Sequence, residues 1–196
     1  MVNAQKSKER LAEAKRKKTL RSRLLYGGVG ILVFSIIGFI LWTTLQPPIG
    51  EGYPILPADH VPDNEFPGVY NSDPPTSGPH YAVGLTRGFY DKSDLPQLPP
   101  YPEGHLVHNL EHGYIIFWYN CEVIDETECI DLKSEISDYM ENSSNIKLIA
   151  FPWDSIDHPL VLTSWGYRLE LHDFDEAAVR QFIRRNKSLA PEPNAP

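Results

Sequence analysis

The sequence predicts an α+β fold. One small extracytoplasmic domain, with a short β-sheet and about two helices, follows a single N-terminal transmembrane helix and a proline-rich stalk. Three observations support this prediction. A long uncharged run lies near the N-terminus, prolines crowd the segment after it, and short apolar runs then alternate with segments of helical periodicity. The last part spans about 120 residues, which is enough for one hydrophobic core.

The transmembrane helix is expected at residues 24–45, a run of 22 residues without a charged side chain. As a helix this run would be roughly 33 Å long, and the hydrocarbon core of a bilayer is about 30 Å thick. A cleaved signal peptide would have a shorter apolar region and a small-residue cleavage site, which residues 43–48 do not offer. We therefore expect an uncleaved anchor in the lipid bilayer.

Charge is distributed unevenly along the chain. Residues 1–23 form a basic arm in which nine Lys and Arg residues outweigh two Glu residues, for a net charge of +7. The whole chain carries −8, so the rest carries −15. By the positive-inside rule the arm is cytoplasmic and the C-terminal domain lies outside the cell membrane. A nucleic-acid partner is not expected, because a basic arm directly before a span is better explained as a topology signal that also touches anionic lipid.

Proline content separates the remaining regions. Residues 46–67 are expected to form a Pro-rich linker in extended conformation, since proline fixes φ and donates no amide hydrogen bond. Residues 68–189 are expected to form the extracytoplasmic α+β domain, which opens with an irregular wrap rich in Tyr and Phe. Residues 190–196 contain too few apolar side chains to pack and are expected to form a disordered tail.

Strands are expected where apolar residues run without a helical period. Residues 113–120 are apolar and aromatic on both faces, which is typical of a buried strand. A second strand is expected at residues 146–151. A third is expected at residues 159–171, with Gly166 as a bulge or close-approach site.

Two segments have the pattern of amphipathic helices. Residues 131–142 place Leu132, Ile136, Tyr139 and Met140 on one side. Residues 175–187 place Val179, Phe182 and Ile183 in a buried stripe, and Asp173 and Glu176 before them have capping-box spacing.

The chain has two cysteines, Cys121 and Cys129. Their spacing fits neither the C-x₂₋₄-C of a zinc site nor the C-x-x-C of a redox motif. The compartment outside the membrane permits disulfides. We therefore expect a disulfide that closes a short loop after the first strand.

Histidines are concentrated in residues 105–113, which contain His105, His108 and His112 beside Glu111. On a helix the three histidines share one face, and on a strand His108 and His112 still point the same way. A fourth histidine, His80, ends the sequence Ser-Gly-Pro-His. Imidazole nitrogens suit zinc and copper. We predict a copper or zinc site made by His80, His108 and His112, with His105 or Glu111 as a fourth group; the alternative is a set of ordinary surface and turn histidines.

Three functions are compatible with these residues. The first is binding of a transition metal, for metal handling or metalloprotein assembly. The second is a metal-dependent or His-based extracytoplasmic enzyme with Glu111 as general base. The third is a structural or assembly partner of a membrane complex, in which the histidines only hold the wrap on the core. H-E-x-x-H is absent and methionines are scarce, which disfavours zincin chemistry and a Met-rich Cu(I) site. We favour the first function, without catalysis.

Three segments carry a resemblance to a known family: residues 70–80 (YNSDPPTSGPH), 107–114 (VHNLEHGY) and 162–166 (LTSWG). Together they resemble a bacterial family known as domain of unknown function 3105, over about residues 50–189. The resemblance implies that His80, His108, Glu111 and His112 are the signature positions of the family. His105 lies outside that pattern. The family has no established activity, so the resemblance supports a shared site and leaves its chemistry open.

Overall fold

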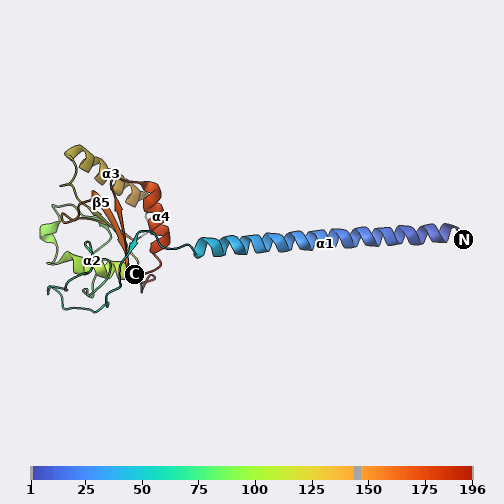
Figure 1. Ribbon diagram of the computed structural model, residues 1–196, viewed down its shortest axis with the longest axis horizontal. Helices are drawn as coiled ribbons and strands as arrows, with labels where there is room; N and C mark the ends of the chain where they lie inside the picture. Colours follow the sequence, from blue (N-terminus) through green and yellow to red (C-terminus); the bar gives the residue numbers. More distant parts are fainter. Residues whose placement is uncertain (1, 144–146, 196) are drawn as a thin grey trace. The chain divides into compact units, whose positions relative to one another are not determined.

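The computed structural model describes residues 2–143 and 147–195. Within them the fold is α+β, as predicted, with four α-helices and a mixed six-stranded sheet (Figure 1). The chain divides into two compact units, residues 1–46 and residues 47–196.

The first unit is helix α1, Val2–Thr44. Its segment Lys15–Thr43 is long and apolar enough to cross a membrane, with a mean hydropathy of 2.4. The helix begins well before the expected span because Ala, Lys, Arg, Glu and Gln of the basic arm are strong helix formers. An ion pair of 2.8 Å between Glu13 and Lys17 adds an i,i+4 contact. The helix ends shortly before Pro47, since a residue that precedes proline avoids helical angles.

The second unit is built on a sheet with the strand order β1-β6-β5-β3-β4-β2. The strands are β1 Glu51–Gly52, β2 Gly88–Phe89, β3 Ile115–Tyr119, β4 Leu148–Pro152, β5 Leu160–Ser164 and β6 Tyr167–Leu171. Strand β3 runs parallel to β4 and antiparallel to β5, and every residue of these three strands is buried. The strand expected at residues 113–120 is therefore the centre of the sheet.

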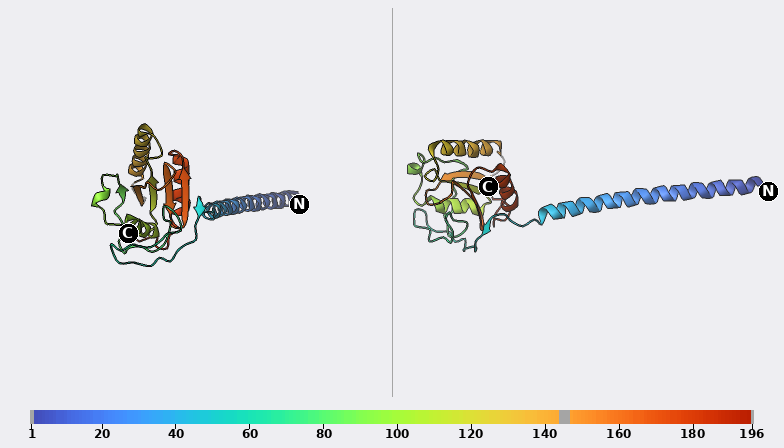
Figure 2. Two further views of the ribbon diagram at one scale, coloured as in Figure 1. Left: turned by 60° about the vertical axis from the view of Figure 1, so that its left-hand side comes forward. Right: turned by 45° about the horizontal axis from the view of Figure 1, so that its top comes forward.

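Helices cover both faces of this sheet (Figures 1 and 2). Helix α3 (Glu126–Asn142) and helix α4 (Glu176–Asn186) pack on one face, while helix α2 (Pro102–Glu111) and the wrap pack on the other. Alternate residues of β3 divide between the two cores, because side chains of a strand point to opposite faces. Ile115, Phe117 and Tyr119 belong to the first core, and Ile116 and Trp118 belong to the second.

Helix α2 is the third helix of the domain, where about two were expected. It begins at Pro102, and proline is favoured at the first helical position because its missing N–H would have no partner there. Only the tertiary structure decides between helix and strand for the histidine segment. The segment forms a helix, in which residues three and four apart share one face.

The other two helices begin at other residues than expected. Helix α3 begins five residues before residue 131, because Asp125 and Glu128 form a reciprocal capping box. Helix α4 is capped by Asp175, whose side chain accepts hydrogen bonds from the backbone N–H of Ala177 and Ala178. The predicted cap at Asp173 is wrong by two residues. The predicted stripe of Val179, Phe182 and Ile183 is buried, as expected.

The segment expected as one strand at residues 159–171 is a hairpin. Ser164 pairs with Tyr167 across a two-residue turn, and Gly166 has φ +75° there. Glycine adopts this left-handed angle without steric cost, so Gly166 lies in the turn of a hairpin and not in a bulge. The close approach expected there is present, since a Cβ at residue 166 would lie 3.3 Å from Ile55 Cγ1. The strand expected at residues 146–151 corresponds to β4; its first residue, Ile146, lies outside the described residues.

The expected stalk and tail both pack against the domain. Within residues 46–67, Glu51 and Gly52 pair with Arg168 and Tyr167 of β6, and His60 forms a β-bridge with His80. In the tail, Glu192 N–H donates to Glu111 O over 3.0 Å. Backbone groups can pair whatever their side chains are, and an uncovered edge strand offers them partners. Composition therefore predicted an extended linker and a disordered tail, whereas the structure has both segments hydrogen-bonded to the domain.

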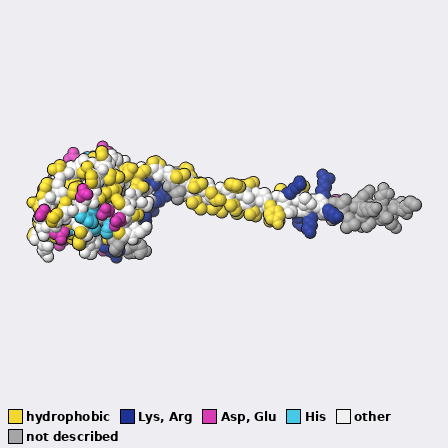
Figure 3. All heavy atoms as spheres, turned by 90° about the horizontal axis from the view of Figure 1, so that it is seen from below, with side chains coloured by type: hydrophobic (Ala, Val, Ile, Leu, Met, Phe, Trp, Pro, Cys, Tyr) yellow, Lys and Arg dark blue, Asp and Glu magenta, His cyan; other side chains and the backbone are white. Residues whose placement is uncertain are grey.

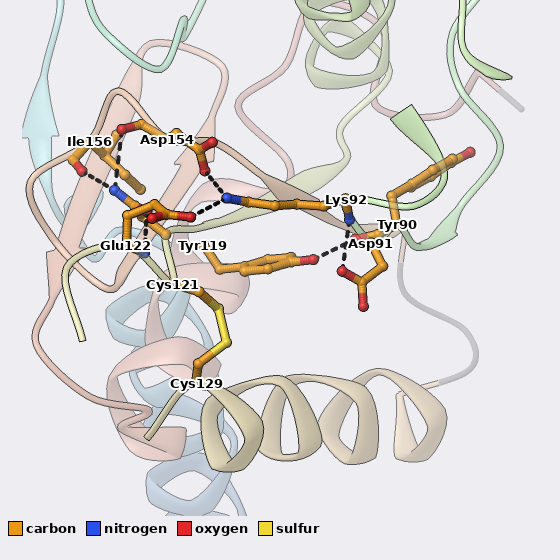
Figure 4. A network of polar contacts seen from close by, with 10 residues as sticks. Tyr90, Asp91, Lys92, Tyr119, Cys121, Glu122, Cys129, Asp154 and Ile156 are labelled. Carbon is orange, nitrogen blue, oxygen red and sulfur yellow. Dashed lines mark hydrogen bonds and ion pairs between the residues drawn. A yellow bond between two sulfur atoms is a disulfide. The ribbon is translucent and has the colours of Figure 1, made fainter. Parts of the chain in front are cut away.

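The expected disulfide joins Cys121 and Cys129, whose Cα atoms are 5.3 Å apart. It ties the loop after β3 to the first turn of α3 (Figure 4). Nearby, Lys92 bridges Glu122 at 2.6 Å and Asp154 at 3.0 Å. These contacts fix the end of the sheet that lies beside α3.

Replacing Asn186 should loosen the attachment of residues 47–52. Asn186 is buried, its Nδ2 donates to Ile49 O over 2.8 Å, and its Oδ1 accepts from Ile49 N over 3.0 Å. Asn186→Ala leaves both backbone groups of Ile49 without these partners, so we expect a loss of about 1–3 kcal/mol in the free energy of unfolding. Denaturant unfolding of the detergent-solubilised chain measures the loss, and proteolysis should cut faster near residue 49.

The matched control is Asn142→Ala, because exposed Asn142 donates only to Asp138 O of its own helix. An equal loss of stability in the two variants would contradict the role given to Asn186.

Candidate metal centre

Four side chains from three separate segments meet beside the C-terminal half of α2. His60, His80, His108 and Glu111 each offer one ligand atom, and these atoms all lie within 4.8 Å of one another. His108 and Glu111 are three residues apart on α2, which places them on one face. His80 comes from the wrap and His60 from the segment before it, so chain pairing must bring them to the helix.

A short β-bridge sets His60 beside His80. Val61 N–H donates to His80 O over 2.9 Å, and His80 N–H donates to Asp59 O over 3.0 Å. The two ring centroids are 4.9 Å apart, and the ring planes are nearly perpendicular. His80 is fully buried, whereas His60 is exposed. The bridge thus places an accessible imidazole over an inaccessible one.

The hydrogen bonds of His80 determine which of its nitrogens carries a proton. Nδ1 lies 2.8 Å from Gly78 O, and a carbonyl oxygen can only accept, so Nδ1 donates. Nε2 lies 3.0 Å from Glu111 Oε2. In the neutral ring Nε2 then has a lone pair directed at a carboxylate. Two buried acceptors in such a position require either a proton, carried by Nε2 or by the carboxyl group, or a metal ion between them.

His108 contributes a neutral ring to this group. Its pKa is lowered to about 4, chiefly by burial and in addition by the nearby rings of His112, His80 and His60. Its Nδ1 is buried and makes no hydrogen bond with any described residue. Metal coordination requires an unprotonated imidazole nitrogen, and this histidine has one at neutral pH.

The structure leaves two predicted ligands outside the group. His105 Nδ1 lies 2.5 Å from Val83 O, and its ring packs on Tyr81 with centroids 4.5 Å apart. That histidine holds the wrap on α2, as the structural alternative proposed. His112 is the C-cap residue of α2, its ring lies 4.3 Å from that of His108, and its Nε2 is 3.4 Å from Glu192 Oε2.

His60 is the member of the group that the sequence analysis missed. It is a single histidine in the proline-rich segment, and no local spacing relates it to residues 105–113. Carboxylates lie around it at Asp59, Asp63 and Glu65, but this local pattern does not point to the other histidines. The pairing with His80 is non-local, so a pattern of spacings along the chain does not reveal it.

The donor set suits a borderline transition-metal ion. Three imidazole nitrogens and one carboxylate oxygen are ligands of zinc and of Cu(II). Ligand atoms about 2.1 Å from a tetrahedral zinc ion are about 3.4 Å apart. The four atoms lie within 4.8 Å of one another, so they would have to approach one another by up to about 1.4 Å to share one ion.

His60, the exposed member of the group, belongs to an acidic domain. Histidine side chains reach the surface on one face of the domain, with Asp and Glu side chains around them (Figure 3). The chain beyond the basic arm has a net charge of −15. A negative surface raises the local concentration of cations, which favours their arrival at the group.

Residues 62–196 match the sequence profile of a family described as protein of unknown function (DUF3105), a match over more than half of the chain. The chain belongs to the DUF3105 family. No curated protein and no solved structure matches it. The region of the DUF3105 match contains His80, His108 and Glu111, while His60 lies two residues before it.

In the metal-free DUF3105 protein, His108 should make stability fall as the pH drops below about 6.5. The lowered pKa means that the unfolded chain takes up a proton at a pH where folded His108 does not. The loss begins near the ordinary histidine pKa and is complete near pH 4. It should amount to about 1–2 kcal/mol, because partial solvent exposure reduces the full effect.

Denaturant unfolding at pH 7 and at pH 5, with a chelator present, measures this loss. His108→Gln should show a smaller difference between the two pH values than wild type. His172→Gln replaces an exposed histidine outside the group and should behave as wild type. Burial raises the pKa of Glu103, which acts in the opposite direction in all three proteins. An identical pH difference in wild type and His108→Gln would contradict the assignment.

Proposed function

We propose that this DUF3105 protein is anchored in the cell membrane by α1 and binds one copper or zinc ion through His60, His80, His108 and Glu111. The domain lies outside the cytoplasm and serves in metal handling or metalloprotein assembly. One observation carries the proposal: the Nε2 atom of buried His80 faces the carboxylate of Glu111 at 3.0 Å while its Nδ1 is held by Gly78 O.

A metal ion accounts for this geometry better than a proton does. Histidines that bind metals usually donate their other ring N–H to a carbonyl or carboxylate, and His80 has that bond to Gly78 O. A proton on His80 would explain only the contact between His80 and Glu111. It would not explain why two further imidazoles, His60 and His108, converge on the same point.

Exposure favours exchange of the ion over catalysis. His60 is exposed, so an ion in this group is reached by a partner molecule from one side. Glu111 is the carboxylate that the enzyme alternative needs as general base. It already faces His80, so we assign it as a ligand. These two features support a site that loads and releases a metal.

Metal binding should depend on the buried members of the group. We expect the full-length protein in detergent to bind about one Zn²⁺ or Cu²⁺ per chain, with a rise in thermal stability. At a free metal concentration of 100 times the Kd, the free energy of unfolding would rise by about 2.7 kcal/mol. His80→Ala and His108→Ala should abolish both effects, and His60→Ala should weaken binding because it removes one ligand of four. Elemental analysis and thermal melts with added metal measure them.

The matched control is His172→Ala, which should bind metal as wild type does, because His172 lies outside the group. Wild type without metal or without a metal-dependent melt would contradict the proposal. Equal binding by His80→Ala and wild type would also contradict it.

The topology has its own test. Basic residues precede the span and the acidic domain follows it, so we expect residues 51–196 outside the cytoplasm. Protease added to intact spheroplasts should digest the domain and leave a cytoplasmic marker protein intact. Protection of the domain under those conditions would overturn this orientation.

A further inference from the structure

Basic side chains of the domain are concentrated on one helix. Beyond the basic arm the chain has nine Lys and Arg residues among 24 acidic ones. Four of the nine lie within eight residues of α4 and its end: Arg180, Arg184, Arg185 and Lys187. In Figure 3 a group of Lys and Arg side chains lies apart from the histidines. An acidic domain thus has one basic surface.

Three of these residues form a stripe. Arg180, Arg184 and Lys187 are spaced i, i+4 and i+7, so they share one face of the helix. All three are exposed, while Val179, Phe182 and Ile183 face the core. Arg180 forms an ion pair with Glu176, whereas Arg184 and Lys187 form none with the residues that the structure describes. Two positive charges of the stripe are therefore not neutralised.

The same end of α4 holds the chain that comes from the membrane helix. Arg185 Nη1 donates to Pro47 O over 3.2 Å, and Asn186 makes hydrogen bonds to both backbone groups of Ile49. Helix α1 ends at Thr44. Pro47 is three residues further along the chain than Thr44, and an extended chain of that length covers only about 10 Å.

This short tether limits how far the end of α4 that contacts Pro47 can lie from the end of the span. The headgroup layer adds about 5–8 Å to each side of the hydrocarbon core. Electrostatic attraction acts over about 8–10 Å at physiological ionic strength. Arg184 and Lys187 lie within one helical turn of Arg185, which contacts Pro47, so their long side chains can reach the lipid phosphates.

We propose that Arg184 and Lys187, with Arg180 beside them, form a docking surface for the anionic phosphates of the lipid leaflet in which the chain is anchored. The proposal rests on the membrane anchoring proposed above and does not depend on the metal. Docking holds α4 against the headgroups. The acidic remainder of the domain is repelled by the same anionic surface, so the histidine face stays open to a partner.

The helix dipole explains only part of this pattern. Lys and Arg at a helix C-terminus stabilise it by offsetting the partial negative charge of the last carbonyls. That effect falls off within the last turn, and Arg180 lies more than one turn earlier. It also does not explain why the basic helix end is the one that holds Pro47 and Ile49.

A reporter on the exposed loop after α4 tests the docking. The described cysteines are both in the disulfide, so Ser188→Cys introduces a single free thiol for a fluorophore beside Lys187. The full-length protein is placed in nanodiscs that contain a headgroup-spin-labelled lipid as quencher, with either purely zwitterionic or 30% anionic lipid. We expect quenching at residue 188 to be about twofold greater in anionic discs and to fall toward the zwitterionic value at 0.5 M salt.

Two variants and a second reporter separate charge from position. Arg184→Gln with Lys187→Gln should remove the dependence on lipid charge, whereas the charge-preserving pair Arg184→Lys with Lys187→Arg should keep it. A fluorophore at Ser134→Cys, exposed on α3, should not respond to lipid charge. Equal quenching at residue 188 in both kinds of disc, or an unchanged response in the Gln variant, would overturn the docking proposal. Failure of the chain to enter nanodiscs at all would overturn the anchoring instead.

Discussion

The contact between His80 and Glu111 is the constraint on which the candidate site depends. It joins the wrap to α2 across 31 residues of chain, and His80 is fully buried when it does so. The backbone bridge to His60 and the bond from Nδ1 to Gly78 O then fix the remaining freedom of this ring. A buried polar side chain with both nitrogens engaged can take few other positions. The fold itself therefore holds these side chains together.

The sheet explains why such an arrangement can form from irregular chain. Strand β3 is buried on both faces, and α2 packs on one of them through Leu106, Val107 and Leu110. These apolar contacts hold the helix that carries His108 and Glu111. The prolines and tyrosines of the wrap then need only pack on this platform. For example, the hydroxyl of Tyr70 donates to Pro79 O over 2.9 Å, directly before His80.

Charge organises the molecule on a larger scale. The basic arm directly precedes the apolar helix segment in sequence, and the stripe lies on α4, whose Arg185 donates to Pro47 O, three residues after the end of that helix. The rest of the domain is acidic. A metal ion that binds the histidine group would be attracted by the acidic surface and repelled by the basic surface. Both proposals use the same unequal distribution of charge, one through the cation and the other through the lipid phosphate.

The sequence by itself determined the α+β class, the apolar helix, the buried strand β3, the stripe of α4 and the disulfide. Each of these follows from local periodicity, from composition, or in the case of the disulfide from two cysteines without another use. It also predicted one group of His80, His108 and His112 with His105 or Glu111, of which the structure brings His80, His108 and Glu111 together. Only the tertiary structure decided that His60 joins them, that His105 bonds Val83 O instead, and that residues 47–67 and 190–195 pack. The reason is physical: these outcomes depend on backbone hydrogen bonds between distant segments, and every residue except proline offers the same N–H and C=O groups for them, so composition and spacing do not encode which partner is chosen.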